Sequence, residues 1–241
     1  MIIRSDLLRR TWSALPLFPC PTCERGFLEE KKKLIENTQR SLVGYTDYGS
    51  DPEDIEGRFY FLLQCKACGE GVGVSGTTEQ VEESDEYGER GYVDNFEVLS
   101  MIPSLRIISI PEQTPPEVAT AIRKAEQLWF PDASAAANQF RIACERLMDV
   151  FCPNHSGKYI SLDARIKAFG GLKNGKHQEQ ADMLLSAKWI GNHGSHGVIK
   201  DEDVYFEAHV LAQVLHDLYD DTKANLLVKA KAINTNKGPL P

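Results

Sequence analysis

The chain has 241 residues, of which 42% are hydrophobic and 26% charged, the composition of a soluble globular protein. Its net charge of −8 argues against a general duplex-DNA binder, because such proteins depend on neutralising phosphate. No apolar run approaches the roughly 18 residues of a membrane span, and the first six residues contain no uninterrupted apolar segment of a secretory signal. We therefore expect a cytoplasmic protein without membrane contact.

Two C-x-x-C pairs follow an N-terminal stretch, residues 5–12, for which a short helix is expected. The pairs are Cys20 with Cys23 and Cys65 with Cys68. This doubled spacing is typical of paired zinc knuckles, in which two tight turns grip one tetrahedral ion. A reducing cytoplasm disfavours disulfides, and the doubling disfavours idle thiols. We expect a closed site of four cysteines that binds a structural Zn²⁺ and leaves no coordination position open for catalysis.

The residues around the knuckles predict a small antiparallel sheet. Strands are expected at residues 59–63, 71–74, 96–99 and 105–110, because these runs are rich in β-branched and aromatic side chains. Residues 44–57 and the acidic residues 79–89 are expected to be loops, and Lys31, Lys32 and Lys33 a solvated surface. Residues 1–112 are therefore interpreted as a zinc-ribbon and β domain.

Prolines mark the change to a second domain, residues 113–241, where the β pattern disappears. Thr114 and Glu117, with Pro115 and Pro116 between them, predict a capping box that begins a first helix. Further helices are expected from about residue 132, over residues 161–169 with Gly170 and Gly171 as the stop, from about residue 178, and from residue 201 past residue 218. Apolar residues recur at helical spacing and should face inward: Val118, Ile122, Ala125, Trp129, Phe140, Cys144, Leu147, Phe151, Val204, Ala208, Leu211 and Leu215. The expected fold class is α+β, with the ribbon followed by an up-and-down helical bundle.

The fourth helical segment carries the polar residues that most resemble a site. Lys188, Asn192 and His196 are spaced by four, so a continuous helix places them on one stripe. Gly191 and Gly194 lie between them, and each costs a helix roughly 1 kcal/mol relative to alanine. Close approach of a partner backbone would compensate that cost. The alternative is a helix that simply ends here, with Gly194 as its C-cap.

These motifs together resemble a known family. The proline-led first helix, the stretch Phe140 to Glu145, and Gly191-Asn192 followed by His196 are similar to an uncharacterised bacterial HEPN-like helical domain. That domain is often preceded by a two-knuckle zinc ribbon and is also found fused to restriction-endonuclease subunits. The resemblance covers the chain from Cys20 to about Leu218.

The resemblance implies one possible chemistry, RNA cleavage, but this sequence departs from the motif that performs it. The wider HEPN superfamily includes ribonucleases that cut RNA without metal, using an arginine, a polar residue and a histidine. Asn192 and His196 match the second half of that motif, but Gly191 stands where the arginine is expected. Lys188 or Arg141 would have to supply the charge, and lysine lacks the two-pronged grip of arginine on phosphate. Arg141 alternatively forms a helix-surface ion pair with Glu145, four residues later.

Two functional hypotheses follow. The first is a non-catalytic binding or scaffold module of a defence or restriction system, with a protein partner, a homodimeric bundle and a structural zinc. The second is a metal-independent endoribonuclease whose site comprises His196, Asn192, Lys188 and Arg141. The missing arginine and the acidic balance favour the first, in which RNA remains a possible partner and Asn192 and His196 hydrogen-bond neighbouring helix ends.

Overall fold

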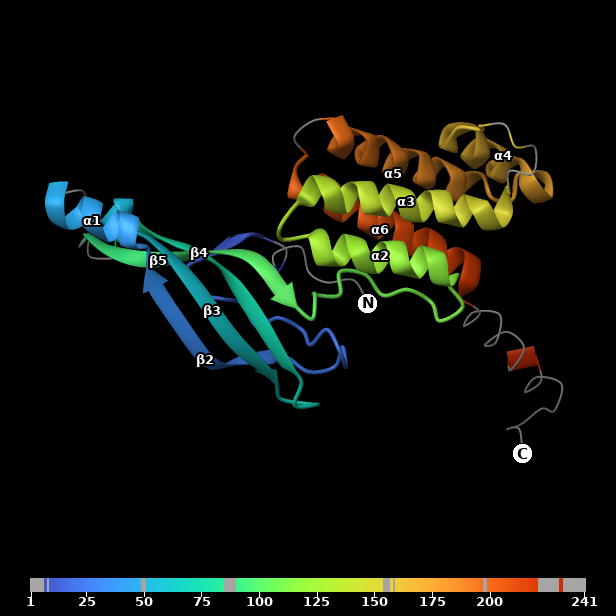
Figure 1. Cartoon of the computed structure of the whole chain (residues 1–241). Coiled ribbons are helices and arrows are strands. Elements are labelled where there is room, and N and C mark those ends of the chain that lie inside the picture. Colours follow the sequence, from blue (N-terminus) through green and yellow to red (C-terminus); the bar gives the residue numbers. More distant parts are fainter. Residues whose placement is uncertain are drawn as a thin grey trace.

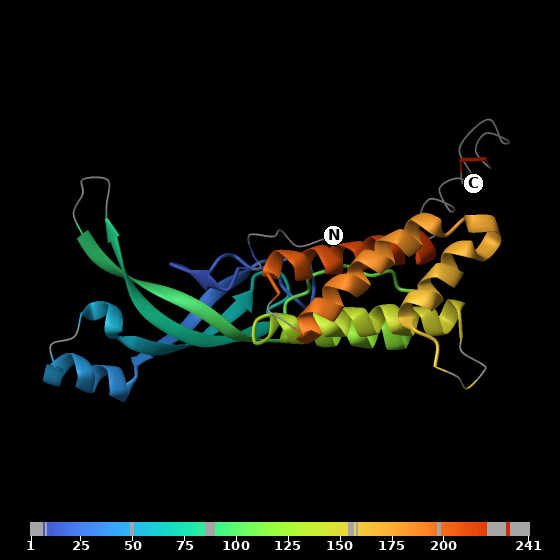
Figure 2. The same cartoon turned by 90° about the horizontal axis from the view of Figure 1, so that it is seen from above.

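The computed structural model describes residues 7, 9–48, 51–84, 90–153, 157, 159–196, 199–220 and 230–231, apart from the side chains of residues 47, 48, 174 and 193–196. A β-sheet and a group of packed helices lie end to end (Figures 1 and 2). Within the described residues, buried side chains from both regions belong to one hydrophobic cluster. The chain is therefore α+β, as expected from the sequence.

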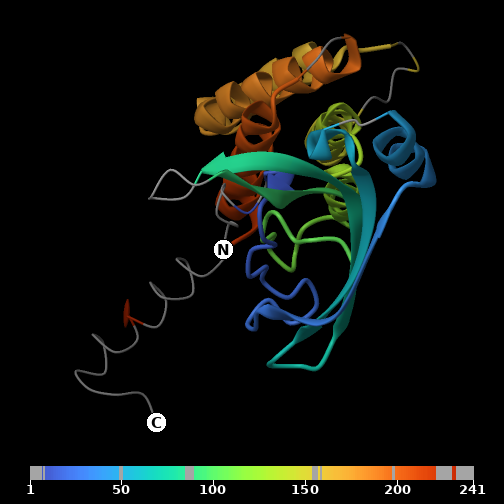
Figure 3. The ribbon, with the colours of Figure 1, turned by 90° about the vertical axis from the view of Figure 1, so that its left-hand side faces the viewer.

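The sheet is antiparallel throughout, in the order β1-β5-β4-β3-β2. Its strands are β1 (Thr11–Trp12), β2 (Leu28–Asn37), β3 (Glu56–Cys65), β4 (Gly71–Ser84) and β5 (Arg90–Ile102). Alternate residues of β3 are buried, because successive side chains of a strand point to opposite faces. Phe59, Phe61 and Leu63 thus face inward, where the sheet curves around the N-terminal segment and the residues that follow β5 (Figure 3).

The helical region comprises α2 (Pro116–Leu128), α3 (Ala133–Phe151), α4 (Leu162–Gly175), α5 (Gln178–His196) and α6 (Asp201–Tyr219). In Figure 1, α3 lies between α2 on one side and α5 on the other, while α4 lies at the end of the region. Of the inward positions expected from the sequence, all are buried except Phe151, which is partly buried. Among the described residues, no helix is both long and apolar enough to cross a membrane.

Several N-terminal expectations are wrong. Thr11 and Trp12 are not helical but form β1, which pairs with β5. Residues 28–37, including the three consecutive lysines, form the edge strand β2. Most of its side chains are exposed, so it lacks the alternation of apolar and polar residues that predicts a strand. Residues 39–48 form α1 (Gln39–Tyr48), and η2 (Pro52–Asp54) follows it. β4 extends to Ser84 and β5 begins at Arg90, so residues 79–84 of the expected acidic loop are strand, and residues 85–89 lie outside the description.

Two corrections concern helix ends. Pro115 is the N-cap of α2 and no side chain caps it, so the capping box predicted at Thr114 does not form. The hydroxyl of Thr114 is instead buried, with no hydrogen-bond partner among the described residues. α4 continues through Gly170 and Gly171 to Gly175, whose φ of +80° ends it, because glycine adopts that conformation without strain. α3 begins as predicted, with the Asp132 side chain accepting a hydrogen bond from the backbone N–H of Ala135.

Candidate functional site

Two turns bring the predicted metal ligands together. Cys20 and Cys23 lie in the turn before β2, whereas Cys65 is the last residue of β3 and Cys68 lies in the turn that follows it. The four Sγ atoms lie within 4.8 Å of one another. Between the turns, Sγ of Cys20 is 3.7 Å from Sγ of Cys68, and Sγ of Cys23 is 3.7 Å from Sγ of Cys65.

These distances fit a tetrahedral ion. Four sulfurs, each about 2.3 Å from a central Zn²⁺, would be separated by about 3.8 Å. The backbone also favours thiolates: Thr22 N–H donates to Sγ of Cys20 at 3.4 Å, and Ala67 N–H donates to Sγ of Cys65 at 3.3 Å. Gly26 leaves room for this packing, because a Cβ there would lie 2.6 Å from Sγ of Cys65. The four cysteines are therefore compatible with a structural metal site.

The acidity of the thiols differs within the cluster. The backbone N–H groups of Arg25 and Gly26 lower the pKa of Cys23 to about 6. The N–H of Cys68 likewise lowers the pKa of Cys65. For Cys68, the N–H of Glu70 lowers the pKa, but burial and the three neighbouring sulfurs outweigh it and raise the value to about 12. A cation that shares the accumulated negative charge is what allows all four sulfurs to be thiolates together.

The second predicted site lies on α5, where its candidate cation Lys188 has a partner of its own. Lys188 is buried and forms an ion pair with Asp163 of α4, with Nζ 3.1 Å from Oδ1. The ammonium also lies 3.7 Å from the ring centroid of Trp189. Hydrogen bonds from Lys167 and Lys188, and the positive charges of both, lower the pKa of Asp163. Lys188 is thus engaged with α4 and is not an isolated cation.

Arg141 lies against α5 but is likewise paired. Its Nη1 is 2.5 Å from Oε1 of Glu145, the predicted pair at four-residue spacing, and its Nε donates to Asn138 at 3.2 Å. A Cβ added at Gly191 would lie 2.6 Å from Cβ of Arg141. The close approach that Gly191 permits is therefore made within the chain, between α5 and α3. Residues 191–196 remain helical, so α5 does not end at Gly194.

Asn192 is partly buried on α5, one residue beyond Gly191. The side chain of His196 lies outside the described residues, so the expected alignment of Asn192 and His196 stays a prediction.

Glu207 of α6 is a notable residue of this region that sequence reasoning missed. Its side chain is fully buried, and neither carboxylate oxygen has a hydrogen-bond partner among the described residues. Burial raises its pKa to about 9, although Arg141 acts to lower it. Oε1 lies 3.0 Å from the position of a Cβ on Gly191, so this acid occupies the space that the glycine leaves. Its burial could have been predicted from the sequence, because Glu207 lies three residues after Val204 and four before Leu211, on the same inward face of α6.

The fold and the cysteine cluster together define a protein with a candidate structural metal site joined to a helical domain. Residues 10–100 match the model of a family described as Domain of unknown function (DUF8608). Residues 123–236 match a second model, described as Domain of unknown function (DUF4145). Comparison with curated proteins finds no match, and comparison with solved structures finds none. Neither family description carries an activity.

Proposed function

We propose that the chain is a non-catalytic binding or scaffold module in a bacterial defence or nucleic-acid-associated system. The observation that carries this proposal is the pairing of both candidate cations: Lys188 with Asp163, and Arg141 with Glu145. Metal-independent RNA cleavage requires a cation that meets the developing charge on phosphate. Breaking the Lys188–Asp163 pair would cost free energy before any substrate gained a contact, because Lys188 is buried. The HEPN-like resemblance supplies the biological setting.

The proposed metal is one Zn²⁺ per chain, bound by Cys20, Cys23, Cys65 and Cys68. Four thiolates in a closed tetrahedral set suit zinc and leave no position for water, which supports a structural role. Metal analysis should give about one equivalent of zinc. Cys65→Ser should abolish binding and unfold the N-terminal region while most of the helical circular-dichroism signal remains. Folded protein without metal, purified without chelator, would contradict this part of the proposal.

An endoribonuclease is the second candidate, and one contact favours it. Arg141 packs against Gly191, so an arginine lies one residue from Asn192 although the α5 sequence lacks it. Rearrangement of the Arg141–Glu145 pair would bring a guanidinium toward the end of α5, where His196 is the expected general base. Asn192 and His196 would then act with Arg141 or Lys188.

One set of variants separates the two candidates. Single-stranded RNA is incubated without added divalent metal with wild-type protein and with His196→Ala, Lys188→Ala and Arg141→Ala, all carrying their bound zinc. We expect no cleavage by any of them and a lower melting temperature for His196→Ala, because its partners lose a hydrogen bond. Products with a cyclic phosphate, formed by wild type and lost in His196→Ala and Lys188→Ala, would establish the ribonuclease instead.

The binding role needs its own experiment. Tagged wild-type protein is recovered from the native host with and without nuclease treatment, together with Cys65→Ser as a control that lacks the metal site. A partner that is retained after nuclease and lost in the control identifies a protein contact that depends on the N-terminal region. Light scattering of the same preparation tests the expected homodimer, since a 27 kDa particle at high micromolar concentration would contradict it.

A further inference from the structure

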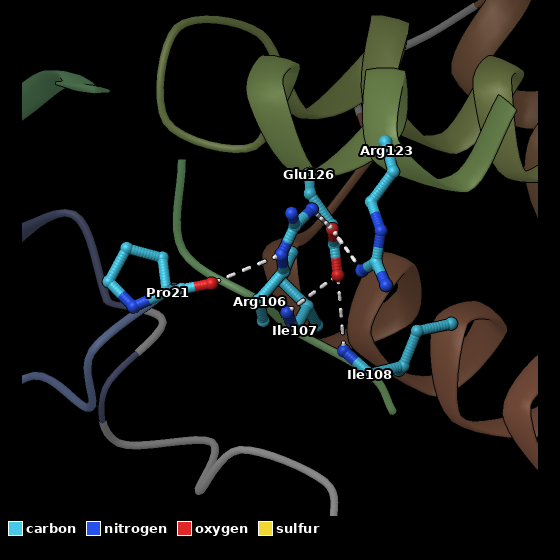
Figure 4. Close-up of polar contacts among 6 residues, drawn as sticks. All are labelled: Pro21, Arg106, Ile107, Ile108, Arg123 and Glu126. Atoms are coloured by element: carbon cyan, nitrogen blue, oxygen red, sulfur yellow. Dashed lines mark hydrogen bonds and ion pairs between the residues drawn. The ribbon is translucent and has the colours of Figure 1, made fainter. Parts of the chain in front are cut away.

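The first metal knuckle is linked to the helical region through Arg106 (Figure 4). Nε of Arg106 donates to the carbonyl oxygen of Pro21 at 3.4 Å, and Pro21 lies between Cys20 and Cys23. Nη1 of the same guanidinium lies 3.2 Å from Oε2 of Glu126 in α2. One side chain therefore contacts both the metal-binding turn and the first helix of the bundle.

Glu126 is the buried end of this link. Among the described residues, four N–H groups reach its carboxylate. The backbone N–H of Ile107 donates to Oε1 at 2.9 Å and that of Ile108 at 3.4 Å, while the guanidinium groups of Arg106 and Arg123 reach Oε2. Residues 105–110, expected to be a strand, are therefore not part of the sheet and are held by this helix carboxylate instead. The carboxylate is fully buried yet well paired, the arrangement in which a buried charge is tolerated.

Aromatic packing makes a second contact beside the same knuckle. Phe18, two residues before Cys20, is fully buried. Its ring centroid lies 5.6 Å from that of Trp12 and 6.4 Å from that of Phe130, which follows α2. Both sides of Cys20 are thus attached to the helical region, Phe18 by packing and Pro21 by the Arg106 hydrogen bond.

We propose that metal binding at the four cysteines and the docking of α2 on the N-terminal region are thermodynamically coupled through Arg106 and Glu126. The inference rests on the proposed metal site. The position of the Pro21 carbonyl depends on the turn that the metal organises, and Arg106 relays that position to Glu126. Because such coupling is reciprocal, a weaker junction lowers metal affinity, and metal loss loosens the junction. The junction then responds to the metal and thiol state of the knuckles.

Two matched arginine variants test the first direction. Arg106→Ala and Arg123→Ala each remove one guanidinium from Glu126, at similar exposed fractions of 34% and 30%. Of the two arginines, Arg106 is the one that donates to Pro21 among the described residues. Zinc affinity and release rate are measured on the full chain by competition with a chromophoric chelator. We expect Arg106→Ala to weaken zinc binding about 5- to 10-fold, and Arg123→Ala to change it less than about 2-fold.

Amide hydrogen exchange in the wild type tests the reverse direction and does not depend on a variant folding. The N–H groups of Ile107 and Ile108 donate to Glu126, so their exchange should report the junction directly. Removing zinc should accelerate exchange at both amides, and Arg106→Ala should show most of that acceleration with zinc still bound.

The outcomes separate the two proposals. Zinc bound equally well by wild type, Arg106→Ala and Arg123→Ala would overturn the coupling and leave the metal site intact. Exchange at Ile107 and Ile108 that is unchanged by zinc removal would also overturn it. Wild-type protein that binds no zinc would overturn the metal site and the coupling together.

Discussion

Glu126 and Glu207 are both buried acids of the helical region, and the structure holds them in opposite ways. Glu126 receives hydrogen bonds from two backbone N–H groups and two arginines. Glu207 has no hydrogen-bond partner among the described residues, and burial raises its pKa to about 9. The first acid is therefore paired on both of its oxygens, whereas burial favours the neutral form of the second.

The difference shows where polar residues stabilise this fold and where they cost stability. At Glu126 the carboxylate accepts hydrogen bonds from the backbone N–H groups of Ile107 and Ile108, so it fixes the segment between the sheet and α2. At Glu207 the carboxyl group fills space beside Gly191, where α3, α5 and α6 meet, and it has no hydrogen-bond partner among the described residues. Removing the first acid should therefore destabilise the protein, and neutralising the second should stabilise it.

The largest effect is expected at the paired acid. Glu126→Ala leaves the N–H groups of Ile107 and Ile108 unsatisfied and separates two guanidinium groups from their counter-charge. The free energy of unfolding should fall by about 4 kcal/mol, as for other broken buried pairs. Denaturant unfolding at pH 7 measures this, with Glu117→Ala as a control at an exposed position of the same helix. Equal values for the two variants would show that the hydrogen bonds of Glu126 do not stabilise the fold.

An intermediate effect is expected at the unpaired acid, and it depends on pH. Folding raises the pKa of Glu207 from 4.5 to about 9, so between these values the folded chain keeps a proton that the unfolded chain releases. Its contribution to stability is therefore complete below pH 4.5 and is lost as the pH rises toward 9. Between about pH 6 and pH 8.5 the loss amounts to roughly 3 kcal/mol, at about 1.4 kcal/mol per pH unit.

Glu207→Gln should remove that pH dependence and make the protein more stable than wild type at pH 8.5. Glu202→Gln is the control, because Glu202 is exposed in the first turn of the same helix. Thermal unfolding across the pH range measures the difference between each variant and wild type. Parallel pH profiles for wild type and Glu207→Gln would show that Glu207 is ionised in the folded state.

The sequence predicted which four cysteines form the candidate metal site, because their spacing is encoded locally. Two C-x-x-C turns bring four sulfurs together once their flanking strands pair, and β2 and β3 do pair beside the turns. The helices were also predictable, since apolar spacing marks their buried faces. β2 was missed because an edge strand with exposed lysines lacks the alternation that identifies a half-buried strand.

Contacts between distant elements were not predictable in the same way. Residues 105–110 have the composition of a strand, but Glu126 supplies an acceptor that competes with strand pairing. The partner of Lys188 comes from α4, and the neighbours of Gly191 come from α3 and α6. Spacing within one helix identifies residues that share a face, but it does not identify the element that packs against that face.

The smallest effect is expected at Gly191, the glycine beside Glu207. It tests how tightly α3, α5 and α6 pack around that carboxyl group. In Gly191→Ala the new Cβ would lie 2.6 Å from Cβ of Arg141 and 3.2 Å from the carbonyl oxygen of Ala137. Since backbone atoms of α3 cannot rotate away, α5 must shift, and overpacking of this kind costs about 1–3 kcal/mol. We expect a net loss of about 2 kcal/mol in the free energy of unfolding, despite the better helix propensity of alanine.

Gly171→Ala in α4 is the matched control, because a Cβ at that position meets no atom within 4 Å. It gains the helix propensity of alanine without a clash, so it should raise the free energy of unfolding by about 0.5–1 kcal/mol. The same substitution should then lower the free energy of unfolding in α5 and raise it in α4. The difference between the two changes gives the contribution of packing, separate from that of helix propensity. If both variants were stabilising, α3 and α5 would be able to separate at Gly191, and Glu207 would lose the tight enclosure that keeps it protonated.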